Sequence, residues 1–236
     1  MSEHLSKQFD NDLDALRAHV TRMGGLVEEQ VRAALTAFVE GDRDLLETII
    51  ARDAGVDEME IAIDSDCSQL IAKRQPAAGD LRMVLAVGKT VTDLERIGDE
   101  AKKIAKVTRN ILERGMSQCL MQTMHIRAMG NQTVSMLHDV LDAFVRGDTA
   151  MAARIVRLDK EIDQNFRAIV RQMITFMMED PRTITTALDV IFIAKSIERI
   201  GDHSKNIAED VIYITMGRDV RHIGLDALER EVQANE

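Results

Sequence analysis

Two pairs of carboxylates in the chain are spaced so that each pair could hold a cation. Glu95 and Asp99 lie four residues apart, and so do Glu198 and Asp202. On an α-helix this spacing puts both side chains on one face, where like charges cost about 0.2–0.5 kcal/mol unless something offsets them. Carboxylate oxygens are ligands for hard or borderline cations. The pairs therefore indicate either a metal site or a solvated face whose charge nearby arginines and lysines balance.

The two pairs belong to a stretch that the chain contains twice. The segment 94–105 reads LERIGDEAKKIA and the segment 197–208 reads IERIGDHSKNIA, with eight identical residues at an offset of 103. A match of this quality indicates a tandem duplication. Apolar residues at three- and four-residue spacing predict a seam that faces the core. The acids are then expected on the outer side of each helix, beside Gly98 and Gly201, which leave room for an approaching group.

A second set of acids repeats earlier in each half, because Asp53 and Asp57 recur as Asp159 and Asp163 at an offset of 106. They fall beside an apolar seam, where a carboxylate is costly to bury unless it is paired. The sequence leaves two alternatives open: they pair with Arg or Lys of the adjacent helix, or they join the metal site. If each motif helix lies beside the helix before it, four carboxylates share a groove, and a cation would relieve their repulsion. The candidate metal ligands are Glu95, Asp99, Glu198, Asp202, Asp53, Asp57, Asp159 and Asp163.

Apolar periodicity and helix-breaking residues divide the chain into six long helices. A Gly-Asp pair follows the first helix of each half, at 41–42 and 147–148, and the chain's only two prolines, Pro76 and Pro181, mark the next junction. The predicted helices span about residues 5–40, 43–74, 81–113, 117–146, 149–178 and 183–216.

The predicted fold is all-α, with two tandem antiparallel three-helix bundles related by internal duplication. We expect the first bundle in residues 1–115, the second in 116–217 and a charged tail in 218–236. The pair Gly24-Gly25 weakens the first helix and could bend it. The pair Gly79-Asp80 is expected to supply a turn and a cap before the third helix.

Composition narrows the class of protein and its partners. Hydrophobic residues make up 45% of the chain but aromatic ones only 3%, which is typical of helical bundles. A formal net charge of −10 argues against a nucleic-acid partner and against binding anionic lipid. No apolar run approaches the roughly 20 residues that span a bilayer. Two cysteines, Cys67 and Cys119, predict buried free thiols in a reducing compartment, so we expect a cytoplasmic protein.

The duplicated three-helix unit and the motifs Glu95-x-x-x-Asp99 and Glu198-x-x-x-Asp202 resemble the PhoU family, and the resemblance runs from the first helix to about His222. It implies a six-helix fold, frequent homodimers and, in some members, multinuclear clusters of metal at these motifs. Iron, zinc, manganese or magnesium would be the candidate ions. It also implies that the protein represses the phosphate regulon when phosphate is plentiful, through contacts with a membrane sensor histidine kinase and the ATPase of the phosphate ABC transporter.

Enzymatic alternatives find little support in the sequence. A carboxylate-bridged di-iron protein needs Glu-x-x-His motifs, but Gly98 and Gly201 stand three residues after the two motif glutamates. His203 directly follows the second motif, and about 100° around the helix from Asp202 it is expected at the solvent edge rather than as a ligand. We therefore predict a non-enzymatic regulator, with a carboxylate-based metal-binding or storage protein as the alternative.

Overall fold

The computed structural model describes residues 3–115, 124–221, 223–224, 227–228 and 230. These residues form six α-helices and one short 3₁₀ helix, with no β-strand among them, so the predicted all-α class is confirmed. The elements are α1 (Glu3–Glu40), α2 (Arg43–Arg74), α3 (Ala78–Glu113), α4 (Met124–Arg146), α5 (Thr149–Glu179), η1 (Pro181–Thr183) and α6 (Ile184–Met216). The predicted start of the fourth helix near residue 117, and Cys119 with it, fall outside the described residues.

A Gly-Asp pair joins the first two helices of each half, at residues 41–42 and 147–148. Gly41 and Gly147 adopt left-handed backbone with φ of 72° and 66°, a conformation that glycine takes without a Cβ penalty. The next residue caps the following helix: a carboxylate oxygen of Asp42 accepts from the Leu45 N–H at 3.0 Å. Asp148 accepts from the Met151 N–H at 2.8 Å. Each pair therefore ends one helix and starts the next.

The start of α3 differs from its prediction. Gln75 closes α2 in the left-handed region with φ of 48°, and Ala77 is the extended residue from which α3 begins. Pro76 already separates the two helices, since it cannot donate a backbone hydrogen bond. Gly79 and Asp80 consequently lie inside the first turn of α3 and not in a turn before it, which corrects the prediction.

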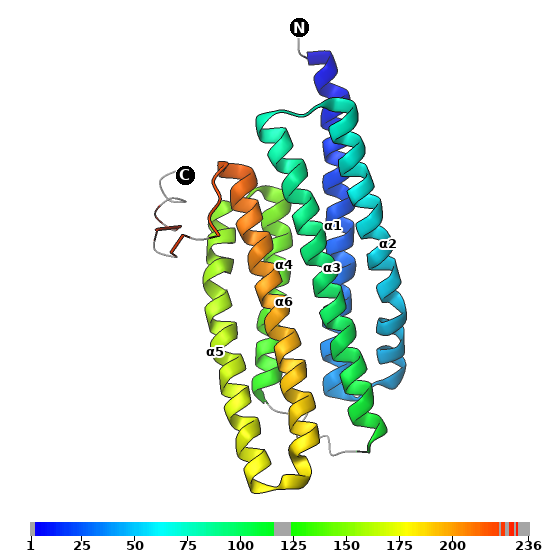
Figure 1. Cartoon of the computed structure of the whole chain (residues 1–236), viewed down its shortest axis with the longest axis vertical. Coiled ribbons are helices and arrows are strands. Elements are labelled where there is room, and N and C mark those ends of the chain that lie inside the picture. Colours follow the sequence, from blue (N-terminus) through cyan, green and yellow to red (C-terminus); the bar gives the residue numbers. More distant parts are fainter. Residues whose placement is uncertain (1–2, 116–123, 222, 225–226, 229, 231–236) are drawn as a thin grey trace.

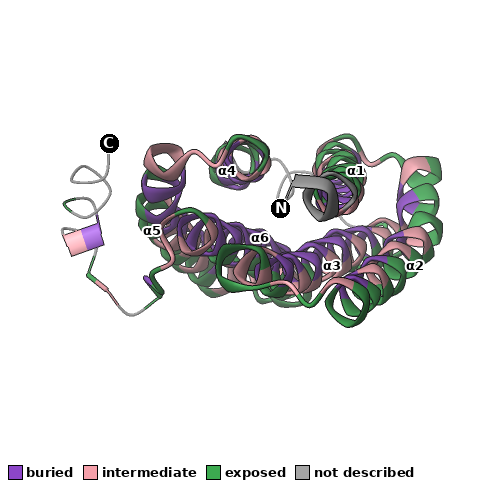
Figure 2. Cartoon of the chain, turned by 90° about the horizontal axis from the view of Figure 1, so that it is seen from above, coloured by how far each residue is buried: buried purple, intermediate pink, exposed green. Residues whose placement is uncertain are grey.

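The six helices form two three-helix bundles packed side by side. Figure 1 shows α3 and α6 running antiparallel at the centre of the molecule, with α2 and α5 at the flanks. Seen from above, α2, α3, α6 and α5 make one curved layer, and α1 and α4 make a second layer over it (Figure 2). Buried residues line the space between these layers. The two motif helices, α3 and α6, thus pack against each other at the junction of the bundles.

Paired glycines let α1 and α4 approach each other in the second layer. A Cβ on Gly24 would lie 2.4 Å from Cδ2 of Leu141, and a Cβ on Gly130 would lie 3.0 Å from Cδ1 of Leu35. The duplication relates these two contacts to each other, because Gly24 and Gly130 are 106 residues apart and so are Leu35 and Leu141. Gly24 is therefore a packing residue in an unbroken α1, and the bend expected at Gly24-Gly25 does not interrupt the helix.

Candidate functional site

Predicted acids of α2 and α3 gather around Lys102 along the contact of these two helices, a cluster that we call the first acidic groove. Lys102 on α3 donates a hydrogen bond to Asp53 on α2. The Lys102 Nζ also lies 3.9 Å from Oδ1 of Asp99, which precedes it on α3. Only 3% of Asp53 is exposed, and a carboxylate buried to that extent requires a partner. Asp53 thus pairs with a lysine of the adjacent helix, and its role as a metal ligand stays a prediction.

Burial, together with the repulsion of neighbouring acids, raises the pKa of a motif carboxyl in the first groove. Burial is the largest cause that raises the pKa of Glu95, and four neighbouring carboxylates raise it further. Those four are Asp99, Glu60, Asp57 and Asp53. Glu60 was missing from the predicted site, although it follows Asp57 by three residues on the same face of α2. Its own pKa is raised by burial and by Asp64 and Asp57.

The second acidic groove repeats this arrangement between α5 and α6. Lys205 donates to a carboxylate oxygen of Asp159 at 2.9 Å, and Asp159 is 5% exposed. Burial raises the pKa of Asp202, and the charges of Glu198, Asp159 and Asp163 raise it further. The structure therefore brings the four predicted acids of this half together, as it does in the first half.

A second lysine distinguishes this groove from the first. Lys195 on α6 donates to Glu198 and lies 5.5 Å from the centre of the Phe166 ring on α5. In the first half Thr92 and Glu60 occupy the corresponding places, at offsets of 103 and 106. The first groove therefore gathers five carboxylates with one lysine and with Arg96, whose charge lowers the pKa of Glu60. The second gathers five carboxylates, Glu209 beside Lys205 included, with two lysines.

The motif acids are less exposed than the sequence predicted. Glu198 is only 8% exposed, and Glu95 is half-buried, because α2 and α5 pack along the faces that were expected to meet solvent. The motif glycines serve this packing: a Cβ on Gly201 would come within 3.0 Å of Ile162 on α5. A Cβ on Gly98 would lie 3.4 Å from Val56 on α2. Gly201 therefore admits the neighbouring helix and does not leave room for a ligand, which corrects the expectation for this glycine, whereas the contact at Gly98 is an ordinary one.

His203 is also placed differently from its prediction. It is 7% exposed and lies between the bundles, where its Nδ1 is 2.8 Å from Oδ1 of Asp93 on α3. Asn206 donates to the same Asp93 oxygen at 3.3 Å. Arg199 and Glu100 form a second ion pair across the junction of α6 and α3, at 2.8 Å. Sequence reasoning missed this polar junction because it treated each bundle separately.

The fit of the grooves to a metal ion depends on their lysines. Within the described part of the chain, no three His, Cys, Asp or Glu side chains are grouped closely enough to hold a metal ion. Instead, Lys102 forms an ion pair with the buried carboxylate of Asp53, and Lys205 forms one with that of Asp159. The oxygen donors suit a hard cation, but the side chains as they stand do not form a ready coordination cage. An incoming ion would have to displace a lysine.

Two further observations bear on the sequence analysis. Cys67 is buried and makes no disulfide, as predicted. Among the described residues, no helix is long and apolar enough to cross a membrane.

The fold and the grooves together define a class of protein: a duplicated six-helix protein in which each half carries an acid-lined groove on its motif helix. The sequence model of the PhoU domain matches this chain twice, at residues 20–108 and 126–211. These matches cover most of both bundles. The chain belongs to the PhoU family.

Individual relatives agree with this assignment over nearly the whole chain. The phosphate-specific transport system accessory protein PhoU of Escherichia coli is 47% identical over 230 residues, which cover 98% of this chain and 94% of the relative. The PhoU homolog of Pseudomonas putida is 45% identical over 233 residues, covering 99% and 90%.

Solved structures give the same result. The crystal structure of PhoU from Pseudomonas aeruginosa superposes with a TM-score of 0.85 at 41% identity, covering 89% of this chain and all of that one. The phosphate transport system regulatory protein PhoU from Streptococcus pneumoniae superposes with a TM-score of 0.82 at 31% identity, covering 90% and 99%. The predicted family and the two-bundle fold are confirmed.

Proposed function

We propose that this protein is a non-enzymatic, cytoplasmic regulator of phosphate homeostasis. When phosphate is plentiful, it would hold a membrane sensor histidine kinase in its repressing state while contacting the ATPase of the phosphate ABC transporter. A homodimer is the proposed working form. The observation that carries the proposal is the near-complete match to relatives named as accessory proteins of a phosphate-specific transport system.

The shape and charge of the chain support action by contact. Its helices are long and expose extended faces, which suit docking of a helix or a domain. The net charge of −10 favours a basic patch on the partner, so association should slow as salt rises.

Affinity purification of the tagged chain from cells grown in high phosphate tests this proposal. We expect the sensor kinase and the transporter ATPase to co-purify, and both signals to weaken when the salt concentration of the wash is raised. Recovery of neither protein at low salt, with the chain itself intact, would contradict contact regulation. The metal-storage alternative would then take first place.

We also propose that a divalent or trivalent cation can enter the acidic grooves. The support is the crowding of carboxylates around a single lysine in the first groove and around two in the second. Such an ion would bind through Glu95 and Asp99 or through Glu198 and Asp202, after Lys102 or Lys205 has moved. Ligand protonation should weaken its binding at acid pH.

Metal analysis of protein purified without chelator tests the cation proposal. The matched variants are E95Q/D99N for the first groove and E198Q/D202N for the second. We expect bound metal to fall in both variants, with the larger loss in the first, where fewer lysines compete. Metal content that is zero in the unsubstituted protein, or equal in all three proteins, would exclude binding at these motifs.

A further inference from the structure

The two flanking helices of the molecule, α2 and α5, carry opposite charge on their exposed sides, although the duplication makes them equivalent. Residues 57–66 of α2 contain five acids and no base, whereas the matching residues 163–172 of α5 contain one acid and two bases. Figure 1 shows α2 and α5 at opposite flanks of the molecule. Opposite charges on two separate faces of one chain are complementary between two copies of it.

The face on α2 surrounds an exposed apolar side chain with acids. Ile61 is 69% exposed. Asp57, Glu58 and Asp64 stand three or four residues from Ile61, so they are its neighbours on the helix surface. All three acids are exposed, and within the described part of the chain none of them forms an ion pair. We call these four residues the acidic face, and its charge is left for an external partner.

The face on α5 combines positive charge with apolar surface. Arg167 stands at the place of Ile61 in the repeat, and Arg171 follows one turn later. Both arginines are exposed, and neither forms an ion pair with another described residue. Ile174 and Met178, on the next two turns, are 48% and 80% exposed. We call Arg167, Arg171, Ile174 and Met178 the basic face. It offers the charge that the acidic face lacks, together with apolar side chains that can pack against Ile61.

We propose that two copies of this chain form a dimer in which the acidic face of each copy contacts the basic face of the other. A two-fold axis parallel to the helices brings α2 of each copy onto α5 of its partner, so that both contacts form and the assembly closes. A two-fold axis across the helices would set α2 on α2 and α5 on α5, with like charges opposed. This inference rests on the proposed function, which takes a homodimer as the working form, and it names the surfaces that pair.

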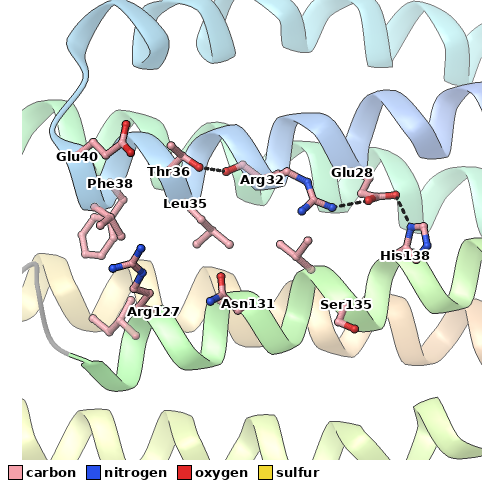
Figure 3. Close-up of a pocket in the computed structure, with 14 residues that line it drawn as sticks. Glu28, Arg32, Leu35, Thr36, Phe38, Glu40, Arg127, Asn131, Ser135 and His138 are labelled. Carbon is pink, nitrogen blue, oxygen red and sulfur yellow. Dashed lines mark hydrogen bonds and ion pairs between the residues drawn. The ribbon is translucent and has the colours of Figure 1, made fainter.

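The other layer of the molecule neutralises charge internally where α1 and α4 face each other. Arg32 donates to Glu28 at 2.7 Å, and Nδ1 of His138 lies 3.3 Å from the same carboxylate (Figure 3). Arg22 on α1 and Arg127 on α4 are exposed and lie outside both proposed faces. This layer therefore provides positions for control substitutions.

Charge reversal in the full-length chain tests the proposal by sedimentation equilibrium. E58R/D64R makes α2 basic, and R167E/R171E makes α5 acidic, so either variant sets like charges against each other at both contacts. We expect each variant to raise the dissociation constant of the dimer at least tenfold. The dimer of the unsubstituted chain should also weaken as salt rises. Far-UV circular dichroism should show equal helix content and melting temperature in all the proteins compared.

An equimolar mixture of the two reversed proteins is the sharper test. In a dimer of one copy of each, the reversed α2 meets the reversed α5, and the two unchanged faces meet each other. Opposite charges then face each other at both contacts, so we expect the dissociation constant to return to within threefold of that of the unsubstituted chain. The control R22E/R127E changes the net charge as much as R167E/R171E does and should stay within twofold.

A photo-crosslinker placed at Ile61 identifies the contact directly. The crosslinker-bearing chain would be mixed with isotopically labelled unsubstituted chain, so that mass spectrometry separates crosslinks between copies from those within one copy. We expect crosslinks to residues 167–178 of the labelled copy. Crosslinks from Ile61 to α2 of the labelled copy would overturn the proposed pairing.

Three further results would overturn the proposal: a monomeric unsubstituted chain, equal dissociation constants in all variants, or no recovery in the mixture. Growth of assemblies beyond the dimer would contradict the closed two-fold arrangement. Binding of the unsubstituted chain to the purified cytoplasmic region of the sensor kinase separates this proposal from contact regulation. If the dimer forms as described and the kinase region is not bound, contact regulation fails and the dimer stands. If a monomer binds the kinase region, the dimer fails and contact regulation stands.

Discussion

The two halves of the molecule share a backbone plan but differ in how they neutralise their acidic grooves. In the first half, Lys102 pairs with Asp53 and Asp99, and the charge of Arg96 acts on Glu60. In the second half, Lys205 serves Asp159 while Lys195 serves Glu198. The acids stand at the same places in both halves, whereas the cations beside them differ. The two grooves therefore differ in their lysines, with one in the first and two in the second, and the predictions below test that difference.

Removal of the groove lysines should have the largest effect. K102M leaves the buried Asp53 without its partner and the first groove without a lysine, so it should lower the free energy of unfolding by about 3–5 kcal/mol. K205M should cost less, because Lys195 remains in the second groove. Urea unfolding at pH 7 measures both. The double variant D53N/K102M, which removes both charges, should recover part of the loss. Equal losses for the two lysines would remove the proposed difference between the grooves.

Asp210 offers the next largest test, at a position where the first half has Val107. Burial raises the pKa of Asp210 to about 7, Lys89 and Arg221 lower it, and Asp93 and Glu209 raise it. A raised acid pKa means that the folded chain holds the proton more tightly than the unfolded chain. The proton on Asp210 therefore adds to the free energy of unfolding. This contribution is fully present below pH 3.8, the ordinary pKa, and is lost as the pH rises towards about 7.

The variant D210N keeps the shape of Asp210 without its charge. It should therefore stabilise the protein more at pH 8 than at pH 5, by a difference on the order of 2–4 kcal/mol. Urea unfolding of both proteins across this pH range measures the difference, and V107A serves as a control that adds no titrating group. A stability difference independent of pH would show that Asp210 is not held neutral by the fold.

The motif glycines should give the smallest effect. G201A places a methyl group 3.0 Å from Ile162, so overpacking of about 1–3 kcal/mol should outweigh the roughly 1 kcal/mol that alanine gains in a helix. In G98A the nearest atoms are 3.4 Å away, an ordinary contact distance, so this variant should keep most of the roughly 1 kcal/mol that alanine gains. Thermal unfolding of both variants checks the order. A larger loss for G98A would contradict the packing described for the two grooves.

The sequence predicted the helices well because their signals are local. The Gly-Asp pairs and the two prolines determine helix ends through nearby backbone geometry, and the repeat relates one half to the other. The gathering of Asp53 and Asp57 with Glu95 and Asp99 could also be predicted, since short connections place successive helices side by side.

What the sequence did not provide is the packing between the halves. His203 contacts Asp93, which lies 110 residues away in the sequence, and no local sequence pattern predicts this contact. The burial of Glu198 depends on how closely α5 approaches α6, which is set by Gly201 against Ile162. A helical period gives the direction of a side chain on its own helix, but not the neighbour that covers it. Glu60 could have been found by extending the spacing from Asp57 by one turn.

Gene expression in a strain that lacks this protein tests the central claim most directly. Transcripts of phosphate-scavenging genes would be measured in high phosphate in the deletion strain, with complementation by the unsubstituted chain. The regulatory account predicts that these transcripts rise on deletion and return to the repressed level on complementation. Transcripts that stay repressed in high phosphate without the protein would contradict it.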